Sequence, residues 1–194
     1  FAQAQGCSWH TARTHTKNLL HKTGLHRQHD VALLARGLLP GNAMTGADAI
    51  AARLYEGILE PAQWVGALQS IQATLQCAAF HQLDIQRADL SVQSVAVSMN
   101  GDAPPSEQVL EYERHYTPQD IRMPSIWQAS EAAVVDHEHF DARTLQRAPI
   151  YTEFLASLGM RHMVAVPLRD GAASRDFVGF LRHPDQKPFG AQEQ

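Results

Sequence analysis

Hydrophobic residues recur at helical spacing between positions 47 and 75. Ile50, Leu54 and Ile58 lie four residues apart, which places their side chains on one face of a helix. Pro61 then favours the start of a second helix, because the amides of a first helical turn are unpaired and proline has none to lose. The apolar positions of this second helix are Trp64, Leu68, Ile71 and Leu75. The pattern therefore predicts two successive helices.

Beyond residue 78 the apolar spacing shortens toward two, which is typical of strands. In the run 91–99, for example, Val92, Val95 and Val97 come close to alternation. Asn100-Gly101-Asp102 follows this run and favours a turn. Strands are predicted over residues 79–86, 91–99, 132–136, 160–168 and 176–182, the last two joined through a turn at 169–171.

Two more helices are predicted between these strands. Residues 106–116 form the first, with Ser106 as a possible N-cap. Residues 144–158 form the second; Pro149 indicates that its start is irregular or lies later in the chain, and Gly159 suits its C-terminal end. Because most strands follow each other closely, we expect them to pair antiparallel. Residues 44–194 therefore predict an α+β domain, an antiparallel sheet flanked by helices.

The composition excludes several classes of protein. The chain has 194 residues, of which 44% are hydrophobic, and no apolar run approaches the ~20 residues of a membrane-spanning helix. Cys7 and Cys77 are too few for a disulfide framework. The sequence carries no glycine-rich phosphate loop, nucleophile elbow or HExxH motif. We expect a cytoplasmic protein that is not an enzyme and needs no cofactor.

A metal site is also not expected. His137-Glu138-His139 places two imidazoles two residues apart, where they could share one face of a strand. A structural metal site needs a third and a fourth ligand, and the spacing along the chain names neither. We therefore interpret these histidines as ordinary surface residues.

Charge is divided unevenly along the chain. The net charge is −4, but residues 1–43 carry five basic side chains and one acidic one, Asp30. The remainder carries eleven basic and nineteen acidic residues. This asymmetry predicts a nucleic-acid-facing segment joined to an acidic domain, although a solvated basic surface would give the same charge count. The turn-rich stretch 40–46 separates the two parts.

The basic segment has the pattern of a helix-turn-helix. Gly6 ends a short helical stretch, Ser8 is a suitable N-cap, and residues 9–22 form a helix that ends near Gly24. One face of this helix is cationic and hydrogen-bonding, as the major groove of DNA requires. That face holds Trp9, Arg13, Lys17 and His21, flanked by His10 and Thr14.

These residues resemble the helix-turn-helix of LuxR-type regulators. In that family's Thr-Val-x-x-His pattern, Thr11 and His15 match, while Ala12 stands where valine is usual. The match covers residues 1–39, and its last helix, 27–38, resembles the helix through which the family dimerises. The resemblance implies a DNA-binding homodimer. It assigns DNA contacts to His10, Thr11, Arg13, Thr14, Lys17 and Lys22.

Two departures from the family concern the order of the parts. The family's first DNA-domain helix, with its Leu-Thr-x-x-Glu opening, is missing from residues 1–41. The family also places this domain at the C-terminus, whereas here it precedes the acidic domain. We therefore expect residues 1–41 to be a partial DNA-binding segment that has been placed ahead of the domain it normally follows.

Residues 44–194 resemble the PAS/GAF-like sensor domain of LuxR-type regulators. In members that bind autoinducers, aromatic residues wall a pocket and a carboxylate accepts a hydrogen bond from the ligand. The resemblance assigns these parts to Tyr112, Tyr116, Asp120 and Trp127. Ile121 replaces the family's proline, and Tyr112 falls one position off its spacing. The ligand could thus be an acyl-homoserine lactone, another partly apolar molecule, or none, in which case the aromatics are core residues.

Two hypotheses follow. The first is a DNA-binding transcriptional regulator whose sensor-like domain responds to a small molecule or a partner. The second is a stand-alone ligand-binding or dimerisation module, to which residues 1–41 add only a helical appendage. Salt-sensitive binding to duplex DNA distinguishes them, because phosphate contacts release counterions.

Overall fold

The computed structural model describes residues 46–129 and 133–190. The chain divides into two compact units, Phe1–Ala67 and Leu68–Gln194. The helix-turn-helix expected over 1–41 lies outside the described residues.

The two predicted helices are present. They are α3 (Gly46–Leu59) and α4 (Pro61–Thr74), and Pro61 begins the second as expected. Gly57 faces Trp64 so closely that a Cβ on the glycine would lie 2.5 Å from the tryptophan Cα. A side chain at position 57 would therefore force these two backbones apart.

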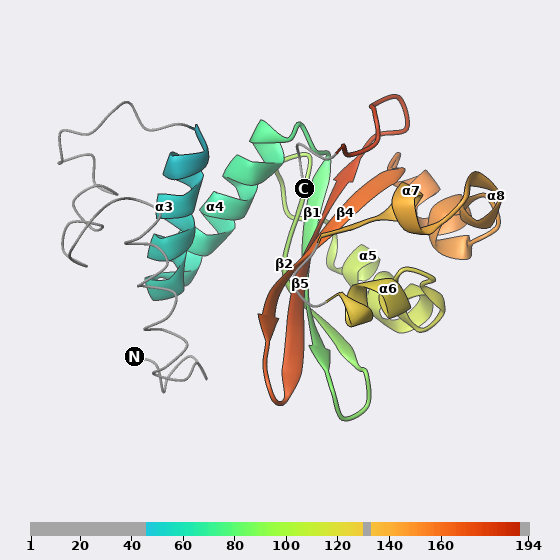
Figure 1. Ribbon diagram of the computed structural model, residues 1–194, viewed down its shortest axis with the longest axis horizontal. Coiled ribbons are helices and arrows are strands. Elements are labelled where there is room, and N and C mark those ends of the chain that lie inside the picture. The colour runs from blue at the N-terminus through green and yellow to red at the C-terminus, as the bar shows by residue number, and fades with distance from the viewer. Residues whose placement is uncertain (1–45, 130–132, 191–194) are drawn as a thin grey trace. The chain divides into compact units, whose positions relative to one another are not determined.

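The second unit is built on a five-stranded sheet in which every pair is antiparallel, which confirms the predicted pairing (Figure 1). The strand order is β2-β1-β5-β4-β3, so the last strand of the chain is the central one. The strands are β1 (Ala79–Gln86), β2 (Val92–Met99), β3 (Val134–Val135), β4 (His162–Asp170) and β5 (Ser174–Arg182). The turn expected at Asn100–Asp102 is also present: Asn100 and Gly101 both have positive φ.

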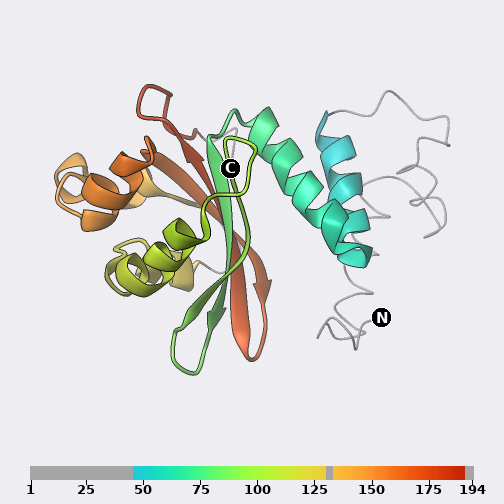
Figure 2. The ribbon, with the colours of Figure 1, turned by 180° about the vertical axis from the view of Figure 1, so that it is seen from behind.

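Short helices between β2 and β4 gather on one face of the sheet (Figure 1, Figure 2). They are α5 (Ser106–Glu111), η1 (Tyr112–Tyr116), η2 (Thr117–Gln119), α6 (Met123–Gln128), α7 (Asp136–His139), α8 (Ala142–Leu145) and η3 (Ile150–Leu155). Two of them, η1 and η3, are π-helical turns. Such wide turns are uncommon and occur often at functional sites.

Because side chains alternate along each strand, one set of them faces these helices. Ala79, Leu83 and Ile85 of β1, with Phe177 and Leu181 of β5, belong to the core cluster that the helices cover. The intervening residues point to the opposite face, because successive side chains of a strand alternate. An antiparallel sheet with helices packed on its face is what the α+β prediction requires.

The structure corrects two local predictions. Residues 144–158 are not one helix: α8 ends at Leu145, and η3 begins only after Pro149, which is the later start that this proline indicated. Proline has no amide to continue a helical ladder, which explains the break. Ser106 is the first residue of α5 rather than its cap, which is Pro105. The predicted end at Gly159 is confirmed: its φ is +66°.

Candidate ligand-binding site

A cavity lies between the sheet and the short helices, entirely within the second unit. Its volume is about 90 Å³, whereas a single water on the same measure needs about 10–15 Å³. Its walls come from β1, β2, β4 and β5 on one side and from α5, η1, α6 and η3 on the other. Apolar side chains dominate these walls. Their members include Leu83, Ile126, Phe154, Leu158, Met163 and Phe177.

An ion pair is buried in the wall of this cavity. The side chains of Asp120 and Arg122 are 0% and 5% exposed, and the Nη2 and Oδ2 atoms that join them are 2.6 Å apart. Arg122 Nε donates to Asp120 Oδ1 at 2.8 Å, and the Arg122 amide donates to the same oxygen at 2.9 Å. Asp120 thus also forms an Asx-type turn. Charge-assisted bonds of this kind are stronger than neutral ones.

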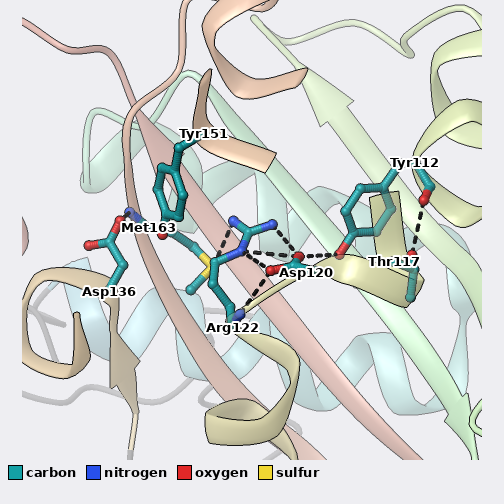
Figure 3. A network of polar contacts seen from close by, with 7 residues as sticks. All are labelled: Tyr112, Thr117, Asp120, Arg122, Asp136, Tyr151 and Met163. Atoms are coloured by element: carbon teal, nitrogen blue, oxygen red, sulfur yellow. Dashed lines mark hydrogen bonds and ion pairs between the residues drawn. The ribbon is translucent and has the colours of Figure 1, made fainter. Parts of the chain in front are cut away.

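Tyr112 completes the cluster around Asp120 (Figure 3). Its hydroxyl donates to Asp120 Oδ2 at 3.1 Å. Thr117 Oγ1 in turn donates to the Tyr112 carbonyl at 3.0 Å, across the π-turn η1. Burial, and then the charge of Asp120, raise the pKa of Tyr112 well above its usual value, so this phenol stays protonated and remains a donor.

A second buried carboxylate lies beyond Arg122. Asp136 Oδ2 accepts from the Tyr151 hydroxyl at 3.0 Å and from the Met163 amide at 3.1 Å. The guanidinium carbon of Arg122 lies 5.5 Å from the centre of the Tyr151 ring, which is within cation–π range. A polar and aromatic network therefore runs from η1 to β4, and it meets the cavity at Tyr112, Arg122 and Met163 (Figure 3).

Arg122 is held as a cation. Burial by itself lowers the pKa of Arg122, but the charge and hydrogen bonds of Asp120 raise it well above the usual arginine value. Two of its guanidinium nitrogens, Nε and Nη2, donate to Asp120. The third, Nη1, donates to the thioether sulfur of Met163 at 3.4 Å. Sulfur is a weak acceptor, so Nη1 is the least satisfied part of the group.

His81 brings an uncharged polar group to the cavity. Its Nε2 lies 2.7 Å from Ser94 Oγ, and its ring meets the Tyr112 ring edge-on at 5.2 Å. Burial lowers the pKa of His81 to about 4. The charge of Glu113 raises this pKa and the charge of Arg122 lowers it, both by smaller amounts. The imidazole is therefore neutral at pH 7.

The predicted ligand residues divide into two groups. Tyr112 lines the cavity and bonds Asp120, so these two lie together. Tyr116 packs on Phe154 at 4.9 Å and donates to Glu153 at 3.4 Å. Trp127 is not among the cavity-lining residues.

Trp127 instead lies among arginines. Its ring centre is 5.2 Å from the guanidinium carbon of Arg87 and 6.0 Å from that of Arg175. Arg175 also donates to the Trp127 carbonyl. Arg122 and His81, which also line the cavity, were not among the residues predicted from the sequence.

Comparisons with known proteins identify the fold. No family model matches the chain, and no curated protein sequence matches it. The chain is structurally similar to the ligand-binding domain of VqsR from Pseudomonas aeruginosa, at a TM-score of 0.57 and 12% identity, covering 77% of this chain and 86% of that one. It is also similar to CepR2 of Burkholderia cenocepacia, an N-acylhomoserine lactone dependent LuxR-family transcription factor, at 0.51 and 15%, covering 75% and 82%.

A third similarity is weaker: GAF3 of Slr1393 from Synechocystis gives a TM-score of 0.44 at 13% identity, covering 77% of this chain and 84% of that one. The chain thus has the α+β fold of LuxR-family ligand-binding domains, as the resemblance implied.

In the described ranges, no helix is both long and apolar enough to cross a membrane. Nor do histidine, cysteine, aspartate and glutamate side chains gather there in groups of three or more that could hold a metal ion.

Proposed function

We propose that the second unit is the small-molecule sensing domain of a DNA-binding transcriptional regulator. The observation that carries this proposal is the cavity, because it combines apolar walls with a few fixed polar groups. That combination is the usual character of ligand sites: apolar surface supplies affinity, and a small number of polar contacts orient the ligand. Tyr112, Arg122 and the neutral His81 are among the polar side chains that line the cavity.

Binding of a neutral apolar dye tests the cavity directly. N-phenyl-1-naphthylamine should fluoresce more strongly when mixed with the full chain. Gly179→Val should reduce dye binding, because Gly179 lines the cavity and a Cβ there has room, at 3.9 Å from Met163. Val95→Ala, at an exposed position of β2, is the control and should bind as the parent does. Equal binding by all three would reject the cavity as a ligand site.

The DNA-binding part of the proposal rests on the sequence of residues 1–41. A chain with a complete helix-turn-helix should bind duplex DNA with an affinity that falls steeply with salt. Arg13→Ala and Lys17→Ala should each weaken binding by about 1–3 kcal/mol if they read bases, or lower the salt slope if they contact phosphates. Asn18→Ala is the control. If both variants bind as the parent does, the assignment of that helical face is wrong.

A stand-alone ligand-binding or dimerisation module is the alternative function. It predicts dye binding without salt-sensitive DNA binding, so the two experiments together separate the hypotheses. The regulator should also be a homodimer, which light scattering of the intact protein would measure.

A further inference from the structure

The polar contacts of Asp120 leave little capacity for a ligand. Its Oδ1 accepts from the amide and Nε of Arg122, and its Oδ2 accepts from Nη2 and from the Tyr112 hydroxyl. A carboxylate oxygen has about two lone-pair directions, so four donors saturate the group. The role that the family resemblance assigned to Asp120, accepting from the ligand, therefore does not suit this geometry.

Arg122 is instead the group with a donor to offer. It lines the cavity and is 4% exposed, and within the described part of the chain Nη1 finds only the sulfur of Met163. A buried N–H that lacks a good acceptor costs free energy, which a ligand oxygen would recover. The acceptor on the ligand should be oxygen, because oxygen is a far stronger acceptor than a thioether.

The charge around Arg122 shows what kind of oxygen fits. Asp120 neutralises the guanidinium at 2.6 Å. Buried Asp136 lies beyond it, and Glu113 is close enough to act on His81. His81 itself is uncharged at pH 7. Because Asp120 already neutralises Arg122, an anionic or a cationic ligand would bring an uncompensated charge into a mostly apolar cavity, and either would pay a desolvation cost.

An independent observation points to a second polar contact. Gln108 lines the cavity, and its Oε1 atom is buried and has no hydrogen-bond partner in the described structure. Gln108 of α5 lies four residues before Tyr112, the first residue of η1, so both side chains project from the same face of this continuous helical segment. Buried polar atoms are nearly always paired, and an unpaired acceptor in a cavity wall is explained by a donor that arrives with a ligand.

We propose that this cavity binds an uncharged, mostly apolar molecule with two polar ends: a carbonyl-type oxygen that accepts from Arg122 Nη1, and a separate hydroxyl or N–H that donates to Gln108 Oε1. The proposal rests on the proposed function, because it specifies the ligand class of the same cavity. It assigns recognition to two residues outside the set that the resemblance selected.

A matched set of eight-carbon probes tests it by titration calorimetry with the full chain. Methyl octanoate carries the acceptor, and methyl 8-hydroxyoctanoate adds the distant donor. Octanoate and octylammonium have the same chain with a negative or a positive end. The two esters should bind, the hydroxy ester more tightly, and both charged probes should bind at least tenfold more weakly than methyl octanoate.

Variants then assign the contacts. The double variant Asp120→Asn/Arg122→Met removes the pair together and keeps an acceptor for the Tyr112 hydroxyl, which avoids an unpaired buried charge. It should weaken methyl octanoate about tenfold, the loss expected for one hydrogen bond to a charged group. Arg87→Met, an arginine outside the cavity lining, is the control. Gln108→Leu should abolish only the advantage of the hydroxy ester.

The outcomes separate the two proposals. If octanoate or octylammonium binds as tightly as methyl octanoate, or if the double variant binds methyl octanoate unchanged, the proposed ligand class is wrong while the cavity remains a binding site. If neither these probes nor the naphthylamine dye binds, both proposals are wrong.

Discussion

Two arginine–aspartate clusters in the second unit differ in their access to water. Arg122 and Asp120 are buried in the cavity wall, with 5% and 0% of their side chains exposed. Arg169 lies near the end of the sheet with 47% of its side chain exposed, and it pairs with Asp84 and Asp176 at 3.2 and 3.0 Å. The residue types and the distances are similar, so the environment is the main difference.

That difference sets what each cluster does. Water reaches and screens Arg169, whose partners Asp84 and Asp176 have 14% and 15% of their side chains exposed, and pairs screened by water contribute at most about 1 kcal/mol to stability. The buried pair has lost its water, so each charge depends on the other. Its burial also carries a desolvation cost, which a pair in contact with water largely avoids. The following predictions test this contrast, beginning with the largest expected effect.

Removing the buried cation should be the most damaging change. Arg122→Ala leaves Asp120 charged and unpaired inside the protein, and we expect the free energy of unfolding to fall by about 3–5 kcal/mol. Urea denaturation followed by circular dichroism measures this. The double variant Asp120→Asn/Arg122→Met should recover much of the loss. A cost below 1 kcal/mol for Arg122→Ala would show that the two clusters are equivalent.

Acid should act on the cavity through His81. Because burial lowers the pKa of His81 to about 4, this imidazole takes up a proton near pH 6.5 in the unfolded chain but only near pH 4 in the folded chain. The stability that neutral His81 contributes is therefore fully present above pH 6.5. The free energy of unfolding falls by about 2–3 kcal/mol as the pH decreases toward 4. His81→Asn should flatten this profile, and the exposed His115→Asn should leave it unchanged. A parent profile that His81→Asn does not alter would contradict the assignment.

The tyrosine that supports the buried pair should have an intermediate effect. Tyr112→Phe removes one donor from Asp120 and keeps the ring, so we expect a loss of about 1–2 kcal/mol in the free energy of unfolding. Tyr116→Phe is a matched control, because its bond to Glu153 is long, at 3.4 Å, and partly exposed. Equal losses for the two variants would indicate that packing rather than the Asp120 bond determines the effect.

Changes to the Arg169 cluster should have the smallest effect on the free energy of unfolding, and that effect should depend on salt. Arg169→Ala should cost about 1 kcal/mol or less. Asp84 and Asp176 face each other across β1 and β5, so the loss should shrink as salt screens their repulsion. The cost of Arg122→Ala should hardly change between low and high salt. A salt-dependent cost for Arg122→Ala would mean that water reaches the buried pair.

Much of the fold could be predicted because apolar periodicity is a local property. The spacing of Val92, Val95 and Val97 predicted β2, and the Asn100-Gly101 turn that follows it has the expected positive φ values. The antiparallel pairing followed from short connections between strands. Pro149 indicated an irregular or later start of the last helix. The separate helix α8 was not predicted, because it is one short turn whose cap is a single local hydrogen bond, in which the Thr144 amide donates to Asp141 Oδ1.

The site was harder to predict, because its residues meet only through the tertiary fold. Tyr112 and Asp120 are eight residues apart and do lie together, while Trp127 lies among arginines instead. The burial of Arg122 depends on Met163, forty-one residues away. No spacing along the chain reports that contact, and an exposed arginine beside an aspartate would give the same local sequence.

The π-turn η1 has a consequence for how relatives of this chain should be aligned. A π-turn contains one residue more than the α-helical turn it replaces, so it can absorb an insertion or a deletion without changing the residues that follow it. Tyr112 stands at the start of η1, and it is the residue that fell one position off the family spacing. A gap of one residue between Tyr112 and Thr117 should therefore be read as a change of helix type, and the pairing of Tyr112 with Asp120 is the reference that sets the register.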